Sequence, residues 1–429
     1  MNVSDSERVS TTLAKDGFEM THDESAADVV IFNTCSVRER AEHKLYTRVG
    51  EVRHSRAKKP VVGIMGCVAQ LEGETLFKKI SGVDFVLGTR AVGRVSNAVS
   101  ETLAGQKGYL DVGEREDNYD WTVADTHRHS PYVAFLPIIE GCNKFCTYCI
   151  VPFSRGRERS LPATEIVRQV IDLKERGVRE VHLIGQNVNS YRPETEAGLE
   201  GMKGKSAFSR LLRAAAATGI ERIKFTTSFP RDFRPAIVDA IEEHENLCNW
   251  VHLPVQSGSN RVLKLMKRGH TIEKYFEKID RIKRSWRDIA LTTDIIVGFP
   301  GETEADFLNT VKMVEYCGFD SAYIFKYSPR PGTPAYDMAD DVTPAEKTLR
   351  FLELEKAQKS IQAKRLRRYL NEVLKVLVEG GSSRTEHGLT GHSTCHKVVN
   401  FEGSPRLLGN VVNVRITEIK TNSLFGEVL

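Results

Sequence analysis

Short apolar runs alternate with longer amphipathic stretches over the first hundred residues. The apolar runs lie at residues 28–33 (DVVIFN), 60–65 (PVVGIM) and 83–87 (VDFVL). Their length and β-branched content are typical of buried strands. Helix-like segments lie beside them at residues 4–16, 37–59 and 71–80. This alternation predicts a parallel α/β domain over residues 1–108, because each helical connection is long enough for a right-handed crossover.

Charged and turn-forming residues interrupt this pattern at 105–131, and residues 111–120 (DVGEREDNYD) have no apolar period. We interpret this stretch as a linker or a loose β excursion. The alternation then resumes on a larger scale over residues 128–359. Candidate strands lie at residues 133–138, 180–184, 222–226, 250–253, 289–296 and 321–325. Such βα units predict a partial or complete (β/α) barrel, with a doubly wound sheet as the alternative.

The end of the chain changes character twice. Residues 343–370 are typical of one long charged helix, with Pro344 near its start, where proline is tolerated. β-type runs follow at residues 373–378, 397–401, 411–419 and 426–429. They predict a small all-β barrel over residues 361–429, so the expected fold class is α/β with an all-β module at its end.

The composition indicates which broad class of protein this chain belongs to. The 429 residues are 40% hydrophobic and 28% charged, which is globular. A net charge of +4 does not by itself indicate nucleic acid. The chain has no apolar signal region and no run of about 18 apolar residues, so we expect a cytoplasmic protein without a membrane partner. In that setting the eight cysteines favour metal binding or redox chemistry over disulfides.

Three of the cysteines stand close together. Cys142, Cys146 and Cys149 have the spacing C-x3-C-x2-C in residues 141–149 (GCNKFCTYC). A [4Fe–4S] cube has four iron corners, so three thiolates leave one iron open to a small molecule. The alternative is a zinc knuckle that takes its fourth ligand from elsewhere in the chain.

This loop, with the aromatic Tyr148 beside its last cysteine, resembles the radical S-adenosylmethionine superfamily. The longer string at residues 141–159 (GCNKFCTYCIVPFSRGRER) is similar to the methylthiotransferase family, especially to the branch that modifies isopentenyl-adenosine in tRNA. The resemblance covers nearly the whole chain. It includes residues 33–38 (NTCSVR), 66–70 (GCVAQ), 183–191 (LIGQNVNSY), 252–260 (HLPVQSGSN), 265–271 (LMKRGHT), 293–302 (TDIIVGFPGE), 325–333 (FKYSPRPGT) and 398–403 (VVNFEG). The tail resembles the TRAM module of RNA-modifying enzymes.

The resemblance implies a chemistry. Cys142, Cys146 and Cys149 would hold a [4Fe–4S] cluster that binds and cleaves S-adenosylmethionine, giving a 5′-deoxyadenosyl radical. That radical would remove hydrogen from C2 of an isopentenylated adenine next to the anticodon. Sulfur and a methyl group would then be added. The implied partners are tRNA, an electron donor of the flavodoxin or ferredoxin type and a sulfur donor, and we expect a monomer.

The same resemblance implies a second, auxiliary [4Fe–4S] cluster on three N-terminal cysteines. Two of them match Cys35 and Cys67, which each follow a predicted strand. The third would fall just before Met1, so we expect a start site placed too late or a shortened chain. The alternatives are a natural variant that lacks this cluster, or cysteines that are simply buried small residues.

Polar residues and glycines at predicted strand ends complete the implied site, because (β/α) barrels bind ligands at the carboxyl ends of their strands. We expect them to bind S-adenosylmethionine; ordinary loop chemistry is the alternative. They are Tyr148, Gly185, Gln186, Asn187, Ser228, Gln256, Ser257, Asp294 and Gly298.

Other residues have two interpretations. Arg155, Arg157 and Arg159 are either a solvated edge or phosphate contacts for RNA. Cys248 and Cys317 are expected in the core. The segment at residues 392–396 (HSTCH) is expected to be an ordinary or RNA-facing loop, with a metal site as the alternative.

Two rival functions stay open. One is a sister methylthiotransferase that acts on threonylcarbamoyl-adenosine in tRNA or on a ribosomal-protein aspartate. The other is a catalytically impaired iron–sulfur RNA-binding protein without a complete auxiliary cluster.

Overall fold

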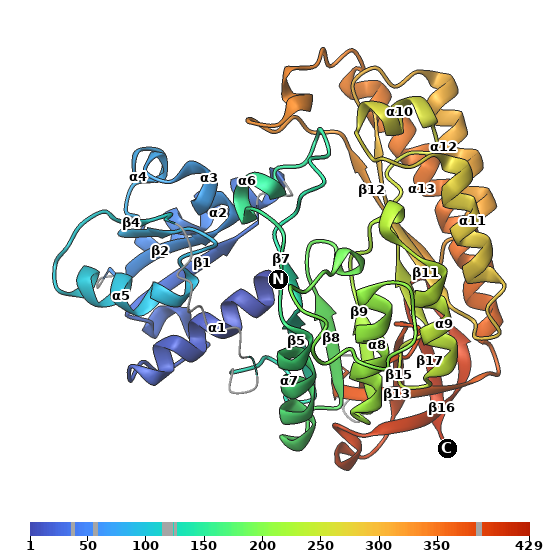
Figure 1. Cartoon of the computed structure of the whole chain (residues 1–429). Helices are drawn as coiled ribbons and strands as arrows, with labels where there is room; N and C mark the ends of the chain where they lie inside the picture. The colour runs from blue at the N-terminus through green and yellow to red at the C-terminus, as the bar shows by residue number, and fades with distance from the viewer. Residues whose placement is uncertain (36–38, 55–58, 114–122, 124–126, 383–387) are drawn as a thin grey trace. The chain divides into compact units, whose positions relative to one another are not determined.

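The structure is a computed structural model that describes all residues except 36–38, 55–58, 114–122, 124–126 and 383–387. The chain forms two compact units (Figure 1). The first consists of residues 1–129, 140–145 and 149–158, and the second of residues 130–139, 146–148 and 159–429. No helix in these described ranges is long and apolar enough to cross a membrane.

The first unit contains a four-stranded parallel sheet in the order β1-β2-β3-β4. Its strands are β1 (Val29–Thr34), β2 (Val61–Gly66), β3 (Phe85–Leu87) and β4 (Tyr109–Asp111). The helices that lie in the segment 1–129 are α1 (Asn2–Lys15), α2 (Glu39–His54), α3 (Cys67–Glu72), α4 (Thr75–Lys79) and α5 (Val95–Leu103). The predicted parallel α/β arrangement is confirmed. Residues 37–38 and 55–58 of the predicted helical region, and residues 114–122 and 124–126 of the predicted linker, lie outside the described residues.

Alternating residues of this sheet face two different hydrophobic clusters. Ile64 and Val86 pack with residues of α2 and α3. Met65 and Phe85, each one position away, pack with residues of α1 and α5. Because successive side chains of a strand point to opposite faces, both faces of the sheet are covered, as a parallel sheet requires.

Two three-stranded parallel sheets form the centre of the second unit, in the orders β5-β8-β9 and β10-β11-β12. The strands are β5 (Val133–Pro137), β8 (Glu180–Ile184), β9 (Arg222–Phe225), β10 (Trp250–His252), β11 (Ala290–Val297) and β12 (Ser321–Lys326). A parallel bridge between Ile223 and Leu247 links β9 to the segment that enters β10. The strands follow one another in sequence order with no switch point, which confirms a partial (β/α) barrel rather than a doubly wound sheet.

Helices follow the strands as expected for βα units. They are α7 (Ala163–Glu175), α8 (Ala207–Ala217), α9 (Pro235–Glu243), α10 (Asn260–Leu265), α11 (Ile272–Lys283) and α12 (Glu304–Cys317). The short elements β6 (Ile139–Glu140), α6 (Val151–Arg155) and β7 (Arg159–Ser160) flank the cysteine loop. The long α13 (Pro344–Leu366) starts at a capping box of Thr343 and Glu346, with Pro344 at its first position.

The tail is a closed five-stranded barrel in the order β13-β14-β15-β17-β16. Its strands are β13 (Val373–Gly381), β14 (Gly388–Ser393), β15 (Val398–Glu402), β16 (Val411–Ile419) and β17 (Leu424–Val428). The predicted all-β barrel is confirmed, and β14 is the strand that the prediction missed.

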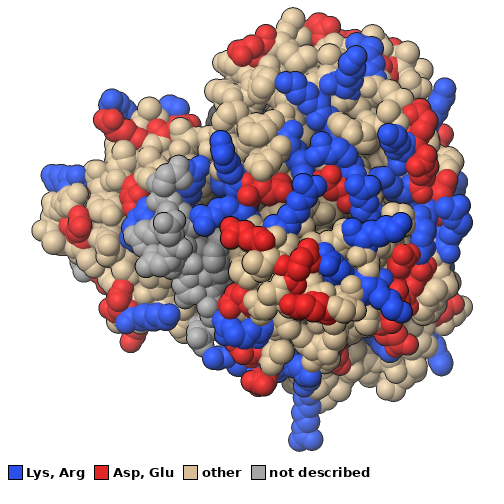
Figure 2. Space-filling view, viewed as in Figure 1, with Lys and Arg blue, Asp and Glu red and all other residues tan. Residues whose placement is uncertain are grey.

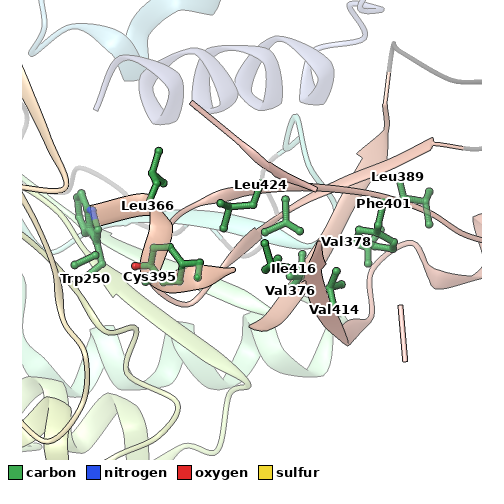
Figure 3. Close-up of a cluster of buried hydrophobic side chains, with 13 residues drawn as sticks. Trp250, Leu366, Val376, Val378, Leu389, Cys395, Phe401, Val414, Ile416 and Leu424 are labelled. Carbon is green, nitrogen blue, oxygen red and sulfur yellow. The ribbon is translucent and has the colours of Figure 1, made fainter. Parts of the chain in front are cut away.

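The tail barrel shares a hydrophobic core with the (β/α) barrel (Figure 3). Trp250, Ala290 and Leu366 pack in one cluster with barrel residues such as Val376 and Phe401. The two guanidinium ends of Arg222 donate to the carbonyl oxygens of His392 and Ser393, both at 2.8 Å. Arg222, Trp250 and Ala290 are each the first residue of a strand. The tail therefore covers the amino ends of these strands, away from the carboxyl ends where ligands are expected.

A buried carboxylate strengthens this junction. Asp320, 1% exposed, accepts from Arg368 at 2.9 Å and from Arg365 at 3.1 Å, and lies 3.3 Å from the Lys397 ammonium group. Burial alone would raise the pKa of Asp320, but Lys397, Arg368 and Arg365 lower it below the ordinary value. The junction is therefore held by charge as well as by apolar contact.

One pH effect follows from His396 at this junction. Burial, with Lys224 nearby, lowers the pKa of His396. The unfolded chain therefore binds a proton near pH 6.5 that the folded chain does not, so stability should fall as pH drops below about 6.5. We expect His396→Asn, which tolerates the positive φ of 59° at this position, to remove part of this slope. For one proton that slope is at most about 1.4 kcal/mol per pH unit.

Urea unfolding of the parent and His396→Asn proteins between pH 5 and 7 measures this slope. Equal slopes in the two proteins would contradict the role of His396.

Candidate active site

The three cysteines of the predicted cluster lie in the loop between β6 and α6. Cys142 and Cys146 are buried, and Cys149 is half-buried. Gly141 has a φ of +78°, and a Cβ there would lie 2.1 Å from the carbonyl oxygen of Arg157. Only glycine fits this close approach, which explains the residue before the first cysteine.

The middle of the loop is fixed through Thr147, which is 4% exposed. Its N–H donates to the Met266 carbonyl at 3.2 Å, and its hydroxyl donates to the Leu265 carbonyl at 2.9 Å. Its own carbonyl accepts from the Ala335 N–H at 2.8 Å. The backbone between Cys146 and Tyr148 is therefore held from two distant parts of the chain.

A buried arginine lies against the same part of the loop. Arg268 is 5% exposed, and its Nη1 lies 3.5 Å from the Cys146 Sγ and 3.4 Å from the Tyr148 hydroxyl. Its Nη2 donates to the Pro254 carbonyl at 2.6 Å. The sequence analysis did not predict Arg268 as a site residue, although it lies within the motif at residues 265–271. The feature that could have indicated it is a cationic side chain directly before a glycine in this motif.

Two of the predicted binding residues carry buried polar atoms without protein partners. Among the described residues, neither Gln186 Oε1 nor Ser228 Oγ has a hydrogen-bond partner. Buried polar atoms are almost always hydrogen-bonded in native proteins, so these two atoms fit a polar ligand. Gly185 precedes them; a Cβ there would lie 2.4 Å from the Ile139 side chain, so the backbone passes close to the neighbouring segment.

The backbone is strained at two of the strand ends. Thr227 after β9 has a φ of +69°, and Gln256 after β10 has a φ of +77°. Positive φ is uncommon for residues other than glycine and costs about 1–3 kcal/mol, so the surroundings must enforce it. The Thr227 carbonyl accepts from the Val188 N–H at 3.0 Å, and the Gln256 N–H donates to the Asp294 carbonyl at 2.9 Å. Such strain concentrates at functional sites.

The remaining predicted residues have protein partners. The Ser257 hydroxyl accepts from the Ser259 N–H at 3.2 Å. Asp294 lies 3.5 Å from the His252 ring, and Asn187 is buried. The Gly298 N–H donates to the Glu302 carboxylate at 2.6 Å. Their roles in ligand binding stay predictions.

The turn after β11 is held by a buried ion pair that sequence reasoning also missed. Glu302 lies 3.0 Å from Arg350 of α13. Burial raises the pKa of Glu302, although Gly298 and Arg350 act in the opposite direction. This carboxylate therefore fixes the turn that contains Gly298, one of the predicted binding residues.

Cys35 and Cys67 come together at one edge of the first unit. The parallel register pairs Thr34 with Gly66, so each cysteine is the residue after a paired position. Asn33 donates to the Asn2 carbonyl at 2.8 Å, which holds the start of α1 at the same edge. The predicted location at carboxyl strand ends is confirmed, and the predicted ligand role stays a prediction.

The prediction for Arg155 is wrong in both of its forms. The side chain is buried, and it pairs with Asp5 at 2.6 Å and Glu140 at 3.3 Å. It is therefore neither a solvated edge nor available to RNA phosphate, whereas Arg157 and Arg159 are exposed.

The predicted core positions of Cys248 and Cys317 are confirmed by exposures of 3% and 1%. Cys395, which was expected in an ordinary or RNA-facing loop, is also buried, with an exposure of 3%. His392 lies on β14 and hydrogen-bonds Glu379 at 2.7 Å.

The cysteine loop can be compared with the ligand sets of a single metal ion and of a cluster. Across the part of the chain that the structure describes, no three His, Cys, Asp or Glu side chains are grouped to hold one metal ion. A [4Fe–4S] cube has separate iron corners, so its thiolates need not meet at a point. The spacing C-x3-C-x2-C places three cysteines on one loop, which matches the three thiolate ligands that such a cluster needs.

Comparison with known proteins supports this assignment. Residues 1–88 match an uncharacterized protein family (UPF0004), residues 136–314 match the radical SAM superfamily, and residues 367–429 match the TRAM domain. The tRNA-2-methylthio-N(6)-dimethylallyladenosine synthases of Mannheimia succiniciproducens and Haemophilus influenzae are 40% identical over 433 residues, covering 100% of this chain and 90% of each relative. The corresponding synthase of Solibacter usitatus is 40% identical and is covered to 95%.

Solved structures show the fold alone. The radical S-adenosylmethionine methyltransferase TsrM of Kitasatospora setae, with a tryptophan substrate and a SAM analog bound, aligns with a TM-score of 0.57 at 15% identity. That alignment covers 78% of this chain and 72% of the other.

Proposed function

Because the chain belongs to the tRNA-2-methylthio-N(6)-dimethylallyladenosine synthase family, we propose that it converts N6-isopentenyladenosine next to the anticodon of tRNA to the 2-methylthio derivative. The observation that carries this proposal is 40% identity over the full chain, together with the three-cysteine loop. It is a radical SAM enzyme and a transferase.

Cys142, Cys146 and Cys149 are the ligands of the proposed [4Fe–4S] cluster. When bound, the cluster and S-adenosylmethionine supply radical chemistry for a C–H bond that acid–base catalysis cannot break. The chain's own residues hold this loop in place: Thr147 fixes its backbone, and Gly141 permits its turn.

Gln186, Ser228 and Gln256 are the polar groups proposed to orient S-adenosylmethionine at the strand ends. The Ser228 hydroxyl is buried and has no hydrogen-bond partner among the described residues, so a bound ligand can supply one. We therefore expect Ser228→Ala to weaken S-adenosylmethionine binding about three- to tenfold, since a net hydrogen bond contributes about 0.5–1.5 kcal/mol. The stability of the ligand-free protein should stay unchanged or rise. Isothermal titration with S-adenosylmethionine and urea unfolding measure the two effects.

Ser209→Ala is the matched control for this variant. Its hydroxyl is buried in α8 and already donates to the Ser206 carbonyl at 2.8 Å. We expect lower stability and unchanged affinity. An Ser228→Ala protein that loses stability but keeps its affinity would assign Ser228 a structural role instead.

The TRAM domain is proposed to bind the tRNA substrate. Lys and Arg side chains are spread over the visible face of the second unit, with acidic groups between them (Figure 2). Exposed cations of the tail and of the segment that leads into it are Arg367, Lys375, Arg406, Arg415 and Lys420. Phosphate contacts from such residues supply affinity that falls with added salt.

The remaining parts of the proposal concern the second cluster and the partners. Cys35 and Cys67 are proposed ligands of an auxiliary [4Fe–4S] cluster that handles sulfur. The enzyme would work in the cytoplasm with an electron donor of the flavodoxin or ferredoxin type and a sulfur donor.

Three substrates distinguish this function from its rivals. Anaerobically reconstituted protein would be incubated with S-adenosylmethionine, dithionite and sulfide. Parallel reactions would contain anticodon stem-loops with isopentenyl-adenosine or threonylcarbamoyl-adenosine, or the ribosomal-protein substrate. We expect a 2-methylthio product only from the first stem-loop. A product only from either of the others would reassign the enzyme, and binding without turnover would favour an inert RNA-binding protein.

A further inference from the structure

We infer that Arg268 is a positioning residue for the proposed radical cluster. Its guanidinium donates a hydrogen bond to the Cys146 sulfur, and this makes the cluster easier to reduce. This inference rests on the proposed function, because it requires a [4Fe–4S] cluster on the cysteine loop. The starting observation is the 3.5 Å separation between Arg268 Nη1 and Cys146 Sγ, in a side chain that is 5% exposed.

The guanidinium is held in place by contacts that do not depend on the cluster. Its Nη2 donates to the Pro254 carbonyl at 2.6 Å, and its central carbon lies 4.4 Å from the centre of the Phe229 ring. Its Nη1 is also 3.4 Å from the Tyr148 hydroxyl. A fork of several donors on a planar group can satisfy these partners and a sulfur at the same time.

The backbone on both sides of this contact is braced as well. Lys267 has a φ of +54°, which turns the chain after α10, and the Arg268 N–H donates to the Leu263 carbonyl at 2.9 Å. Thr147 ties the cysteine loop to the carbonyls of Leu265 and Met266. The donor and the sulfur are thus fixed to each other through the 265–268 segment.

The effect on the cluster follows from charge. Reduction adds one electron to the cluster from an outside donor, with no bond made or broken and no proton moved by Arg268. A permanent positive charge in a buried site favours the more negative, reduced form, and N–H donation to a ligand sulfur acts in the same direction. Hydrogen bonds to the sulfurs are among the protein's main controls on cluster potential.

A potentiometric titration tests this inference. The proteins carry Cys35→Ala and Cys67→Ala, so that only the loop cluster contributes to the signal. They are reconstituted anaerobically, titrated with dithionite and followed by electron paramagnetic resonance. Lys264→Gln is the matched control, because it removes an exposed cation from α10, four residues away.

In Arg268→Gln we expect the ratio of reduced to oxidised cluster at the parent midpoint to fall about tenfold, which is about 59 mV for one electron. Arg268→Lys keeps the positive charge but loses the forked donors of the guanidinium, so the ratio of reduced to oxidised cluster should fall less in this variant. In the control, the ratio of reduced to oxidised cluster should stay within twofold of the parent's ratio.

The inference would be overturned if, at full iron content, both Arg268 variants had a ratio of reduced to oxidised cluster within twofold of the ratio in the control. If Arg268→Gln takes up no cluster, the ratio of reduced to oxidised cluster in Arg268→Lys, compared with the control, decides the outcome. Absence of any cluster in the parent would instead overturn the proposed function, and iron analysis reports it separately from potential.

Discussion

Replacing Cys142, Cys146 and Cys149 together with alanine is expected to abolish 5′-deoxyadenosine formation. The three thiols are the proposed ligands of the radical cluster, and they come from one loop whose position Thr147 fixes. Without them the loop has no thiolate for iron, and the chemistry that needs the cluster is lost. Iron analysis and chromatographic detection of 5′-deoxyadenosine, after incubation with S-adenosylmethionine and dithionite, measure the two losses.

Cys317→Ala is the matched control for this experiment. That thiol is 1% exposed in α12, and burial raises its pKa to well above the ordinary value, as expected of an inert core cysteine. We expect full iron content and turnover, with a modest loss of stability. Continued 5′-deoxyadenosine formation by the triple variant would refute the assignment of the three ligands.

Trp250→Ala is expected to destabilise the second unit by about 3–5 kcal/mol, the usual cost of removing a large buried aromatic side chain. Trp250 is 7% exposed and packs in the cluster shared by the two barrels. Its ring stacks on His252 with centroids 5.9 Å apart, and the Lys224 ammonium lies 4.3 Å above it. Because the cluster belongs to both barrels, their unfolding should remain a single transition. Urea unfolding, followed by circular dichroism and tryptophan fluorescence, measures this change.

Trp286→Ala controls for the loss of a tryptophan in itself. Trp286 is 72% exposed, and surface substitutions usually change stability by less than about 0.5 kcal/mol. A change below about 1 kcal/mol in Trp250→Ala, well under the usual cost of a buried aromatic, would contradict the shared core. So would separate unfolding of the tail.

The elements that the sequence predicted well are those whose own residues carry the signal. The apolar run at residues 60–65 becomes the buried strand β2, and the Thr343–Glu346 capping box marks the start of α13. The strand β14 was missed because its residues (GLTGHS) include two glycines and few β-formers. It forms because neighbours on both sides supply hydrogen bonds, a tertiary effect that propensity does not contain.

The residues of the candidate site also divide into those that the sequence predicted and those that it did not. The cysteine loop was predictable because its spacing is local to residues 142–149. Arg155 was misplaced because its partner Asp5 lies 150 residues away in sequence. Arg268 was missed for the same reason, since its contact with Cys146 spans 122 residues. Charges that act through distant partners need the fold before they can be assigned.

The most direct measurement of the proposed activity is mass spectrometry of tRNA nucleosides from cells that lack this protein, with and without the gene restored. The account predicts that the cells without it accumulate isopentenyl-adenosine. Restoring the gene should convert that nucleoside to its 2-methylthio form, and the Cys142, Cys146 and Cys149 triple variant should not. Identical nucleoside profiles with and without the gene would contradict the account.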